Sequence, residues 1–221
     1  MRPVLRFVAS VLITSGLLML VDAVLTVTWQ EPVSAYFAQR EQNGLNRELK
    51  REAPQVEADK RTLASVRDQR LRLKRLAGLA ERRASTGHAI GSIRIPKIGA
   101  DYAVVEGTDT DSLRKGPGHY PDTSFPGQGG TVAIAGHRTT YLAPFNEIDK
   151  LKKGDEIVLD MPYGKLTYTV EETKIVEPTE LSVVDRVPGA ERLVLSACHP
   201  LYSAAKRIVA FARLKSVELK Q

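Results

Sequence analysis

Cysteine is almost absent from this sequence, whose 221 residues include one, Cys198. A single cysteine excludes an intramolecular disulfide, and four histidines without paired C-x-x-C or H-x-x-x-H spacing argue against a structural zinc site. The sequence also lacks a glycine-rich phosphate loop and an EF-hand pattern, so we expect no cofactor. Glycine (16) and proline (12) stand at ordinary levels, which excludes collagen-like and low-complexity classes.

Excess positive charge is confined to one segment. The formal net charge of the chain is +6, and residues 48–83 hold 11 Lys and Arg against 6 Asp and Glu. Residues 88–221 hold 17 of each sign. A domain that binds nucleic acid needs a basic surface, so this balance argues against a nucleic-acid partner for the C-terminal part.

One long apolar run lies near the N-terminus. From Phe7 to Trp29 the 23 residues include a single charge, Asp22. A helix of this length rises about 35 Å, enough to cross a hydrocarbon core of about 30 Å. Arg2 and Arg6 precede the run and the next basic residue is Arg40, so we expect a single-pass membrane protein with a cytoplasmic N-terminus and an extracellular C-terminal domain. The alternative is a cleaved signal peptide, which the length of the run and the absence of an A-x-A site disfavour.

Residues 31–87 have the composition of a solvated helix between the expected anchor at 1–30 and a domain at 88–221. Apolar residues recur every seven positions on two neighbouring tracks, Leu49, Val56 and Leu63 on one and Leu45, Val66 and Leu73 on the other. Because Pro54 interrupts the pattern and charges occupy several core positions, we predict a monomeric helical stalk that acts as a charged spacer rather than a dimeric coiled coil. Its basic character indicates a solvated face, with attraction to anionic lipids or wall polymers as the alternative.

From residue 88 onward, short apolar runs alternate with turn signals, which predicts an all-β sandwich or barrel of about 134 residues. Pro162-Tyr163-Gly164 predicts a hairpin turn. Short helices are expected at Asp111–Lys115, after a Thr110 cap, and at Pro144–Ile148. The expected strands are Ser92–Ile95, Tyr102–Val105, Thr131–Ala135, Glu156–Met161, Leu166–Glu172, Leu193–Cys198 and Ile208–Leu214.

Cys198 ends one of these strands and is followed by His199 and Pro200. A free cysteine is most often a small buried apolar residue, and that role is the alternative to a catalytic one. Pro200 stops the ladder and opens space at the strand end. Since an unpaired thiol on the oxidising side of a membrane is a liability unless it is used, Cys198 is a candidate nucleophile.

A thiol nucleophile needs a proton acceptor or an imidazolium partner, because the thiolate is the reactive species. His199 is adjacent to the thiol and points to the other face of a strand, and His88 lies in the segment that enters the domain. His137 follows the strand Thr131–Ala135 and is the preferred partner by position, with His119 second.

Acyl transfer also needs positive charge or donors where the oxyanion develops. Arg207 lies nine residues after Cys198 and opens the last expected strand. Antiparallel pairing of that strand with Leu193–Cys198 would place Arg207 beside the thiol. Arg138 is the alternative cation.

Three motifs in this order resemble the sortase family. They are Gly118-His119-Tyr120-Pro121, the segment from Thr131 to Arg138, and Leu195-Ser196-Ala197-Cys198-His199-Pro200 with Arg207 following. The resemblance covers roughly residues 91–217. In Gly136-His137-Arg138-Thr139-Thr140-Tyr141 and in the Cys-His-Pro context, the sequence most resembles class E sortases of Gram-positive bacteria.

This resemblance implies a membrane-anchored cysteine transpeptidase on a closed eight-stranded β-barrel with short helices. It implies Cys198 as nucleophile, His137 as general acid/base, and Arg207 as the residue that holds the substrate backbone and the oxyanion. The enzyme would cleave a Leu-Pro/Ala-x-Thr-Gly sorting signal of a secreted protein between Thr and Gly. The acyl group would pass from a Cys198 thioester to an amine of a cell-wall precursor or a pilin, which attaches surface proteins to the wall.

The resemblance also suggests further substrate-binding residues, with ordinary packing as their alternative: Tyr120, Tyr141, His119 and Arg138. A structural role is preferred for His119. Ala197 and Val194 depart from the family, which commonly has threonine at both positions. Loss of a hydroxyl at residue 197 removes a possible hydrogen bond to substrate or to the Cys198 loop, and this affects signal preference more than reaction type.

Some sortases use calcium through clustered carboxylates. Asp101, Glu106, Asp109 and Asp111 are clustered here, but turn chemistry explains them more simply, and we expect no metal.

Two other functions stay open at the level of sequence. A cysteine hydrolase would use the same three residues, with water in place of the amine. A non-catalytic, membrane-tethered β-domain would bind wall components through its basic stalk. This second function would leave the coincidence of Cys198, His137 and Arg207 unexplained.

Overall fold

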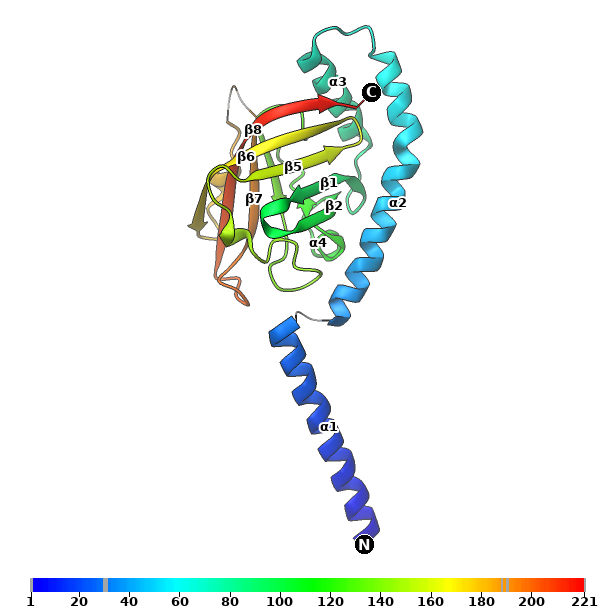
Figure 1. Ribbon diagram of the computed structural model, residues 1–221, viewed down its shortest axis with the longest axis vertical. Coiled ribbons are helices and arrows are strands. Elements are labelled where there is room, and N and C mark those ends of the chain that lie inside the picture. The colour runs from blue at the N-terminus through cyan, green and yellow to red at the C-terminus, as the bar shows by residue number, and fades with distance from the viewer. Residues whose placement is uncertain (1, 30–31, 188, 190, 221) are drawn as a thin grey trace.

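Eight strands close into a β-barrel in the computed structural model of the chain, which describes residues 2–29, 32–187, 189 and 191–220 (Figure 1). The order around the barrel is β1-β2-β3-β4-β7-β8-β6-β5. The pairs β2–β3 and β4–β7 are parallel, and the other neighbours are antiparallel. The strands are β1 (Ala89–Ile95), β2 (Ala100–Glu106), β3 (Gly118–His119), β4 (Thr131–Ala135), β5 (Glu156–Met161), β6 (Gly164–Val176), β7 (Arg192–His199) and β8 (Lys206–Leu219).

All seven expected strands are present, and the expected eight-stranded barrel is confirmed. The sequence did not reveal β3, because two residues are too short to show an alternating pattern. The expected hairpin is also confirmed: Met161 pairs with Gly164 across a two-residue turn. Tyr163 of that turn is buried and its hydroxyl donates to the carbonyl of Pro126, so the turn is tied to the barrel.

Side chains alternate between the inside and the outside of the barrel. In β7, Leu193, Leu195 and Ala197 belong to the main core, whereas Val194 belongs to a separate apolar cluster on the outer face. This alternation fixes the register, because a slip of one residue would turn the whole apolar set outward.

Of the two short helices expected in the domain, one is present and the other is not. Helix α4 (Thr110–Lys115) is present, but its cap is Asp109, whose carboxylate accepts from the backbone N–H groups of Asp111 and Ser112. The expected helix at Pro144–Ile148 is wrong: the segment forms turns and leads into the 3-10 helix η2 (Ile148–Lys150). The carbonyl of Asn146 accepts from the Arg138 guanidinium, so the α-helical hydrogen bond from Lys150 is replaced.

Helix α1 (Arg2–Trp29) carries the long apolar run. Its segment Arg2–Val24 is long and apolar enough to cross a membrane and is exposed along its length. The expected boundary between residues 30 and 31 lies outside the described residues.

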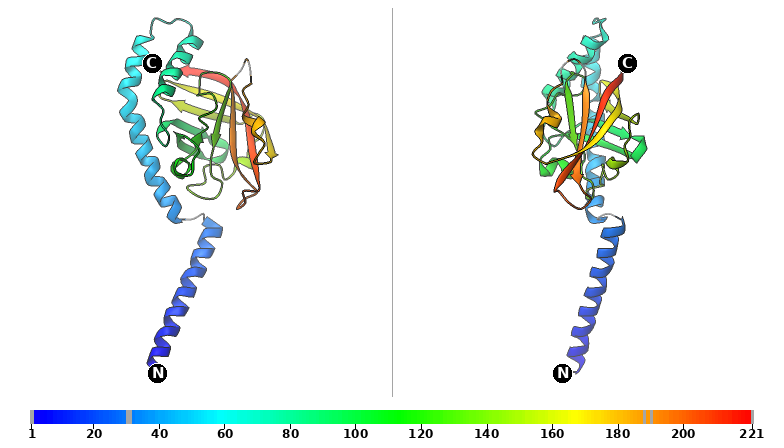
Figure 2. Two further views of the ribbon diagram at one scale, coloured as in Figure 1. Left: turned by 180° about the vertical axis from the view of Figure 1, so that it is seen from behind. Right: turned by 90° about the vertical axis from the view of Figure 1, so that its left-hand side faces the viewer.

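Residues 32–87 are largely helical as expected, but the helices pack on the barrel instead of forming a solvated spacer, which corrects that part of our expectation. Helices α2 (Pro32–Thr62) and α3 (Gln69–Arg83) fold into a hairpin whose two arms lie against the barrel (Figures 1 and 2). Residues of both seven-residue tracks pack on the barrel: Leu45 packs on β1 and β2, and Val56 and Leu73 join the main core. Helix α2 also runs through Pro54, since packing on both sides of the proline holds the helix together.

Gln42 attaches α2 to the edge of the barrel. Its side-chain amide accepts from the Ala103 N–H at 2.7 Å and donates to the carbonyls of Ala103 at 3.1 Å and Lys115 at 2.7 Å. Gly116 leaves room for this amide, because a Cβ there would lie 2.3 Å from Gln42 Nε2. These contacts fix α2 rigidly to β2 and α4.

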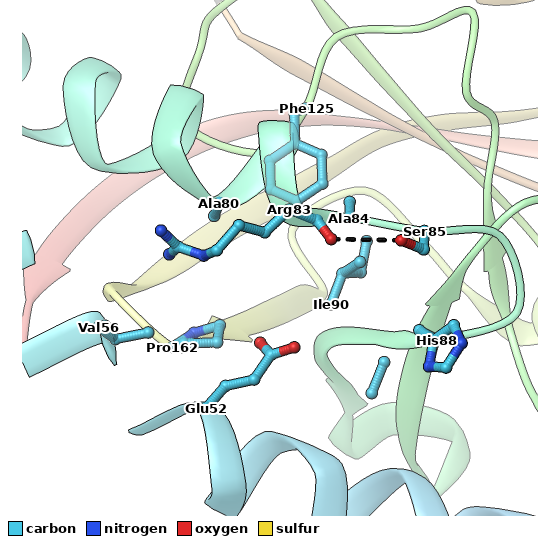
Figure 3. A pocket seen from close by; sticks show the side chains of 11 residues that line it. Glu52, Val56, Ala80, Arg83, Ala84, Ser85, His88, Ile90, Phe125 and Pro162 are labelled. Carbon is cyan, nitrogen blue, oxygen red and sulfur yellow. Dashed lines mark hydrogen bonds between the residues drawn. The ribbon is translucent and has the colours of Figure 1, made fainter. Parts of the chain in front are cut away.

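The seam between the helices and the barrel is closely packed. A cavity of about 20 Å³ remains there (Figure 3). Its lining includes apolar Val56, Ile90, Phe125 and Pro162 and polar Glu52, Arg83, Ser85 and His88. Its volume holds about one water molecule. A 2.7 Å ion pair between Arg83 and Asp59 joins the two helices near this seam.

Candidate active site

The barrel topology brings Cys198, His137 and Arg207 together. Strand β7 lies between β4 and β8, and Cys198 pairs directly with Arg207 in the antiparallel β7–β8 ladder. In the parallel β4–β7 ladder Ala135 pairs with Ser196, so His137 falls level with Cys198 two residues further on. The Gly136 N–H donates to the Ser196 carbonyl at 3.0 Å, which extends this register toward His137.

All three residues lie on the outer face of the barrel. By the alternation along each strand, they are on the same side as Ala133, Val194 and Val209, which form the outer apolar cluster with Phe211. Residues directly opposite in an antiparallel pair have Cβ atoms about 4.5–5.5 Å apart, which puts the Arg207 side chain beside the thiol. The floor of the site is therefore the β4–β7–β8 surface.

The chain passes from β4 to His137 over a buried ring. A Cβ at Gly136 would lie 2.5 Å from the ring of Phe145, which is fully buried. The Phe145 N–H donates to the His137 carbonyl at 3.0 Å. Glycine at 136 thus allows the close approach that sets the position of His137.

His137 has a lowered pKa. Burial lowers its pKa below the ordinary histidine value, and the positive charge of Arg114 lowers it further. The Tyr141 ring lies 5.1 Å from the His137 ring, centroid to centroid, at an interplanar angle of 41°. At neutral pH the imidazole is therefore uncharged and able to accept a proton.

Arg207 is tied to the turn that follows the thiol. Its Nη1 donates to the carbonyls of Ala204 and Lys206, both at 3.0 Å. These contacts order the β7–β8 turn beside Cys198. A planar guanidinium held in this way can present its remaining edge to a carbonyl oxygen on the outer face.

Arg138 is turned away from that face. Its side chain is 3% exposed, and its guanidinium donates to the Asn146 carbonyl and to Asp149 at 3.0 Å. Nη1 also lies 3.4 Å from the Cys198 carbonyl and 3.2 Å from His199 Nδ1. This geometry favours a brace for the nucleophile strand over the substrate contact that we expected.

His119 and Tyr120 have different surroundings. His119 is buried, with Nδ1 3.0 Å from Glu106 Oε2 and Nε2 3.1 Å from the Ser124 carbonyl, as the preferred structural role requires. Tyr120 is partly buried against the outer apolar cluster. Tyr120 and Tyr141 thus lie near the floor of the site, and substrate contact by either stays a prediction.

The departure at Ala197 has a structural meaning. The Ala197 side chain is 3% exposed and faces the barrel core. A threonine hydroxyl at this position would point inward, so the expected hydrogen bond to substrate does not fit the geometry. Val194 is fully buried in the outer apolar cluster beneath the site.

Three of the four clustered acidic residues make local contacts. Asp109 caps α4, Asp111 pairs with Arg114 at 3.1 Å, and Glu106 pairs with His119. Within the described residues, no group of three or more His, Cys, Asp or Glu side chains is arranged to hold a metal ion.

Asn146 and Asp149 contribute to the site but carry no motif. Both residues form hydrogen bonds with Arg138. The turn that precedes them contains three residues in the left-handed conformation, Tyr141, Leu142 and Ala143, with φ of 50°, 65° and 42°. No periodic pattern marks such a turn, because its conformation depends on the buried partners that it contacts.

Comparisons with known proteins agree with this geometry. A family model described as the Sortase domain matches residues 93–215. Sortase D of Bacillus subtilis is 39% identical over 131 residues, which cover 58% of this chain and 65% of that protein. Sortase SrtE1 of Streptomyces coelicolor is 28% identical over 143 residues, which cover 58% of this chain and 41% of that protein. The chain thus spans less than two thirds of the length of these curated relatives.

Solved structures show the same fold. Sortase E from Streptomyces avermitilis has a TM-score of 0.56 and 35% identity, and the match covers 61% of this chain and 93% of that one. A Sortase D5 transpeptidase from Clostridium perfringens has a TM-score of 0.61 at 24% identity and covers 80% of this chain and 98% of that one. Since residues 88–221 make up about 61% of the chain, the second match takes in part of the α2–α3 hairpin as well as the barrel.

Proposed function

Because this chain belongs to the sortase family and is class E-like, we propose that it is a cysteine transpeptidase that cleaves a Leu-Pro/Ala-x-Thr-Gly sorting signal between Thr and Gly. One observation carries the proposal. The β4–β7–β8 order sets Cys198 between His137 and Arg207 on the outer face of the barrel, where all three residues are partly exposed.

Acylation begins with the thiol. The neutral His137 imidazole takes the thiol proton, and the Cys198 sulfur attacks the carbonyl carbon of the signal threonine. The Thr–Gly C–N bond then breaks, and the imidazolium returns its proton to the departing glycine amine. A thioester between Cys198 and the threonine carbonyl remains, with the acyl group still activated.

Arg207 stabilises the negative oxygen of the tetrahedral intermediate. The residue lies across the ladder from Cys198, and its position is held by the turn carbonyls that it contacts. A donor already in place costs no reorganisation when the charge develops.

Deacylation reverses the roles. An acceptor amine attacks the thioester carbonyl and gives its proton to His137, the C–S bond breaks, and Cys198 leaves as a thiolate that is protonated again. A new amide bond joins the signal to the acceptor. Attack by water gives hydrolysis instead, the alternative reaction at the same site.

Helix α1 would anchor the enzyme in the cell membrane, with its N-terminus in the cytoplasm and the barrel outside. Its length and apolar composition support this role, as does the pair Arg2 and Arg6 before the apolar run. Secreted proteins that bear the signal, and an amine on a wall precursor or pilin, would then be its partners. The result is attachment of surface proteins to the cell wall.

Intact mass spectrometry tests the reaction. The full chain in detergent micelles is incubated with Leu-Ala-x-Thr-Gly or Leu-Pro-x-Thr-Gly peptide and a glycine-based amine. We expect an acyl adduct on Cys198 and an amine-dependent ligated product. Both should be lost in Cys198→Ala, and the rate should fall about a hundredfold or more in His137→Gln.

His88→Gln is the matched control, because this exposed histidine lies outside the site and should leave the rate unchanged. An adduct that yields free acid and no ligated product would support the hydrolase. A folded protein that forms no adduct with either peptide, or an unchanged product in Cys198→Ala, would contradict the proposal.

A further inference from the structure

We propose that the active-site end of the barrel is a membrane-docking surface, in which Tyr36, Phe37, Leu201 and Tyr202 enter the lipid headgroup region and hold the site against the bilayer. We call these four side chains the docking residues. The proposal rests on the proposed anchoring by α1 and commits to a lipid surface as the partner.

The start of α2 lies beside the site. Ser34 Oγ accepts from the Tyr141 N–H at 3.4 Å, and the Tyr141 ring stacks near His137. Further along α2, Gln42 and Leu45 fix the helix to the barrel. The N-terminal end of α2 therefore cannot swing away from the site without breaking buried contacts.

The covalent chain keeps α1 close to this end. Helix α1 ends at Trp29 and α2 begins at Pro32. Three Cα–Cα steps of 3.8 Å span at most about 11 Å. Whatever direction α1 takes, the point where it leaves the lipid stays near the start of α2, and hence near the site.

The turn between β7 and β8 lies at the same end of the barrel as the start of α2, and α1 projects from that end (Figures 1 and 2). Cys198 is near the end of β7 that leads into this turn. Cys198 therefore lies at the end of the barrel from which α1 projects.

The side chains exposed here suit a lipid interface. Tyr36 and Phe37 are 62% and 58% exposed, and their rings meet edge to face at 5.7 Å. Leu201 and Tyr202 are 42% and 71% exposed at the tip of the β7–β8 turn. Aromatic side chains concentrate at membrane–water interfaces, where their apolar bodies and polar edges are both satisfied.

Tyr202 supplies an independent indication. Its φ is 62°, a left-handed conformation that glycine or asparagine adopts at less cost. An exposed aromatic ring at a position that disfavours it suggests a contact outside the folded chain.

Basic residues are concentrated elsewhere in the fold, although Arg40 of α2 is exposed at this end. The α2–α3 turn, with Arg61, Arg67 and Arg70 around it, lies at the opposite end of the barrel (Figure 1). Lys206, beside the β7–β8 turn, pairs with Glu177 at 3.2 Å. We therefore expect docking to persist on a zwitterionic bilayer.

The single cysteine allows a direct test with the full chain. The protein is reconstituted into phosphatidylcholine vesicles that carry an energy-transfer acceptor on some headgroups, and Cys198 is labelled with a fluorescent donor. In a comparison protein, Cys198→Ala/Ser65→Cys, the donor lies in the exposed α2–α3 turn. We expect several-fold stronger transfer from residue 198 than from residue 65.

A second variant isolates the docking residues. Tyr36→Ser/Phe37→Ser/Leu201→Ser/Tyr202→Ser should reduce transfer from Cys198 while leaving circular dichroism and the melting temperature unchanged, since all four side chains are exposed. The matched control, Leu71→Ser, removes an exposed leucine of α3 near the opposite end and should not change transfer.

Three outcomes would overturn the proposal. Equal transfer from residues 198 and 65 would show that the site does not face the membrane. Unchanged transfer in the fourfold variant would show that these side chains do not make the contact. Release of the protein by alkaline carbonate would refute the anchoring on which the proposal rests, whereas the acyl-transfer assay in micelles tests the catalytic proposal separately.

Discussion

The Arg138 guanidinium lies behind the nucleophile strand, where it contacts the Cys198 carbonyl, the His199 ring, the Asn146 carbonyl and Asp149. A lysine in this position keeps the charge but loses the planar fork. We therefore expect Arg138→Lys to lower kcat about tenfold or more with little change in KM, because the strand that carries the thiol shifts while the outer face remains. Steady-state ligation kinetics measure this split.

Arg213→Lys is the matched control, since Arg213 of β8 is 68% exposed and pairs with Glu171. Its kcat should equal that of the unmodified protein. An equal loss in both variants, or a change confined to KM, would contradict the bracing role of Arg138.

Glu191 is a second buried charged residue that no sequence motif predicted. Its carboxylate is 6% exposed and accepts from the N–H groups of Gly127 and Gly129 and from the Tyr168 hydroxyl. Burial raises its pKa, although these hydrogen bonds oppose the rise. The residue joins the loop before β4 to the start of β7, and so supports both strands that carry the site.

This raised pKa predicts a pH dependence of stability. The folded state keeps the proton where the unfolded chain has lost it, so the stabilisation from Glu191 falls as pH rises from about 4.5 through the folded pKa. Glu191→Gln cannot ionise and keeps an acceptor for the glycine N–H groups. Relative to the unmodified protein, its unfolding free energy should therefore increase between about pH 4 and about pH 8 in urea titrations.

Glu191→Ala gives the contrasting result, because it leaves the donors of Gly127, Gly129 and Tyr168 without their acceptor. We expect a loss of roughly 2–4 kcal/mol of unfolding free energy near pH 4, which becomes smaller toward higher pH because alanine cannot ionise either. A Gln variant whose difference from the unmodified protein is flat with pH would refute the titration of Glu191.

At the scale of elements, the helical hairpin is part of the catalytic barrel's core. Leu76 and Ala77 of α3 are buried with Phe125 and Tyr163, and Leu45 of α2 covers Ala103. Each fully buried leucine stabilises the fold by about 2 kcal/mol. Loss of Leu45, Leu73 and Leu76 therefore removes about 6 kcal/mol, comparable with the whole stability of a typical domain.

A fragment of residues 88–221 should consequently lack a cooperative thermal transition and should bind a hydrophobic dye. A fragment of residues 32–221 keeps α2 and α3 and should melt at the same temperature as the full chain. Circular dichroism melts and dye fluorescence compare the two. Cooperative melting of the shorter fragment at an unchanged temperature would contradict the role of the hairpin.

The strands could be predicted from the sequence because alternating apolar residues and turn signals are local. The position of the helices could not. The tracks of Leu45, Leu49 and Val56 indicate an apolar face, but they do not say whether another helix, a second chain or a barrel covers it. The break after Thr62, and not at Pro54, likewise follows from the fit of α3 to the barrel rather than from propensity.

The same distinction holds for the site. Cys198, His137 and Arg207 could be selected because each lies at the end of an expected strand, and the ladder registers bring them together. Ala197 could not be assigned a face until the register was known, and Arg138 could not be separated from a substrate contact until Asn146 and Asp149 were located.

For the molecule as a whole, charge and apolar surface are segregated along its length. The α2–α3 turn, with Arg61, Arg67 and Arg70 in or beside it, lies at one end of the barrel (Figure 1). The start of α2 and the β7–β8 turn, which carry the exposed aromatic side chains, lie at the other end, from which α1 projects. The neutral barrel lies between them. This polarity distinguishes the two ends of the protein, and the site lies at the end nearest to Trp29, where α1 ends.

The parallel β4–β7 pairing also has a consequence for biogenesis. His137 and Cys198 lie 61 positions apart in the sequence, and Arg207 follows on the last strand of the barrel. Contacts between distant segments form late in folding, and a chain emerges N-terminus first. All three residues therefore come together only after β8 has joined the barrel, so a chain whose last strand is still unfolded has the cysteine without the complete site around it.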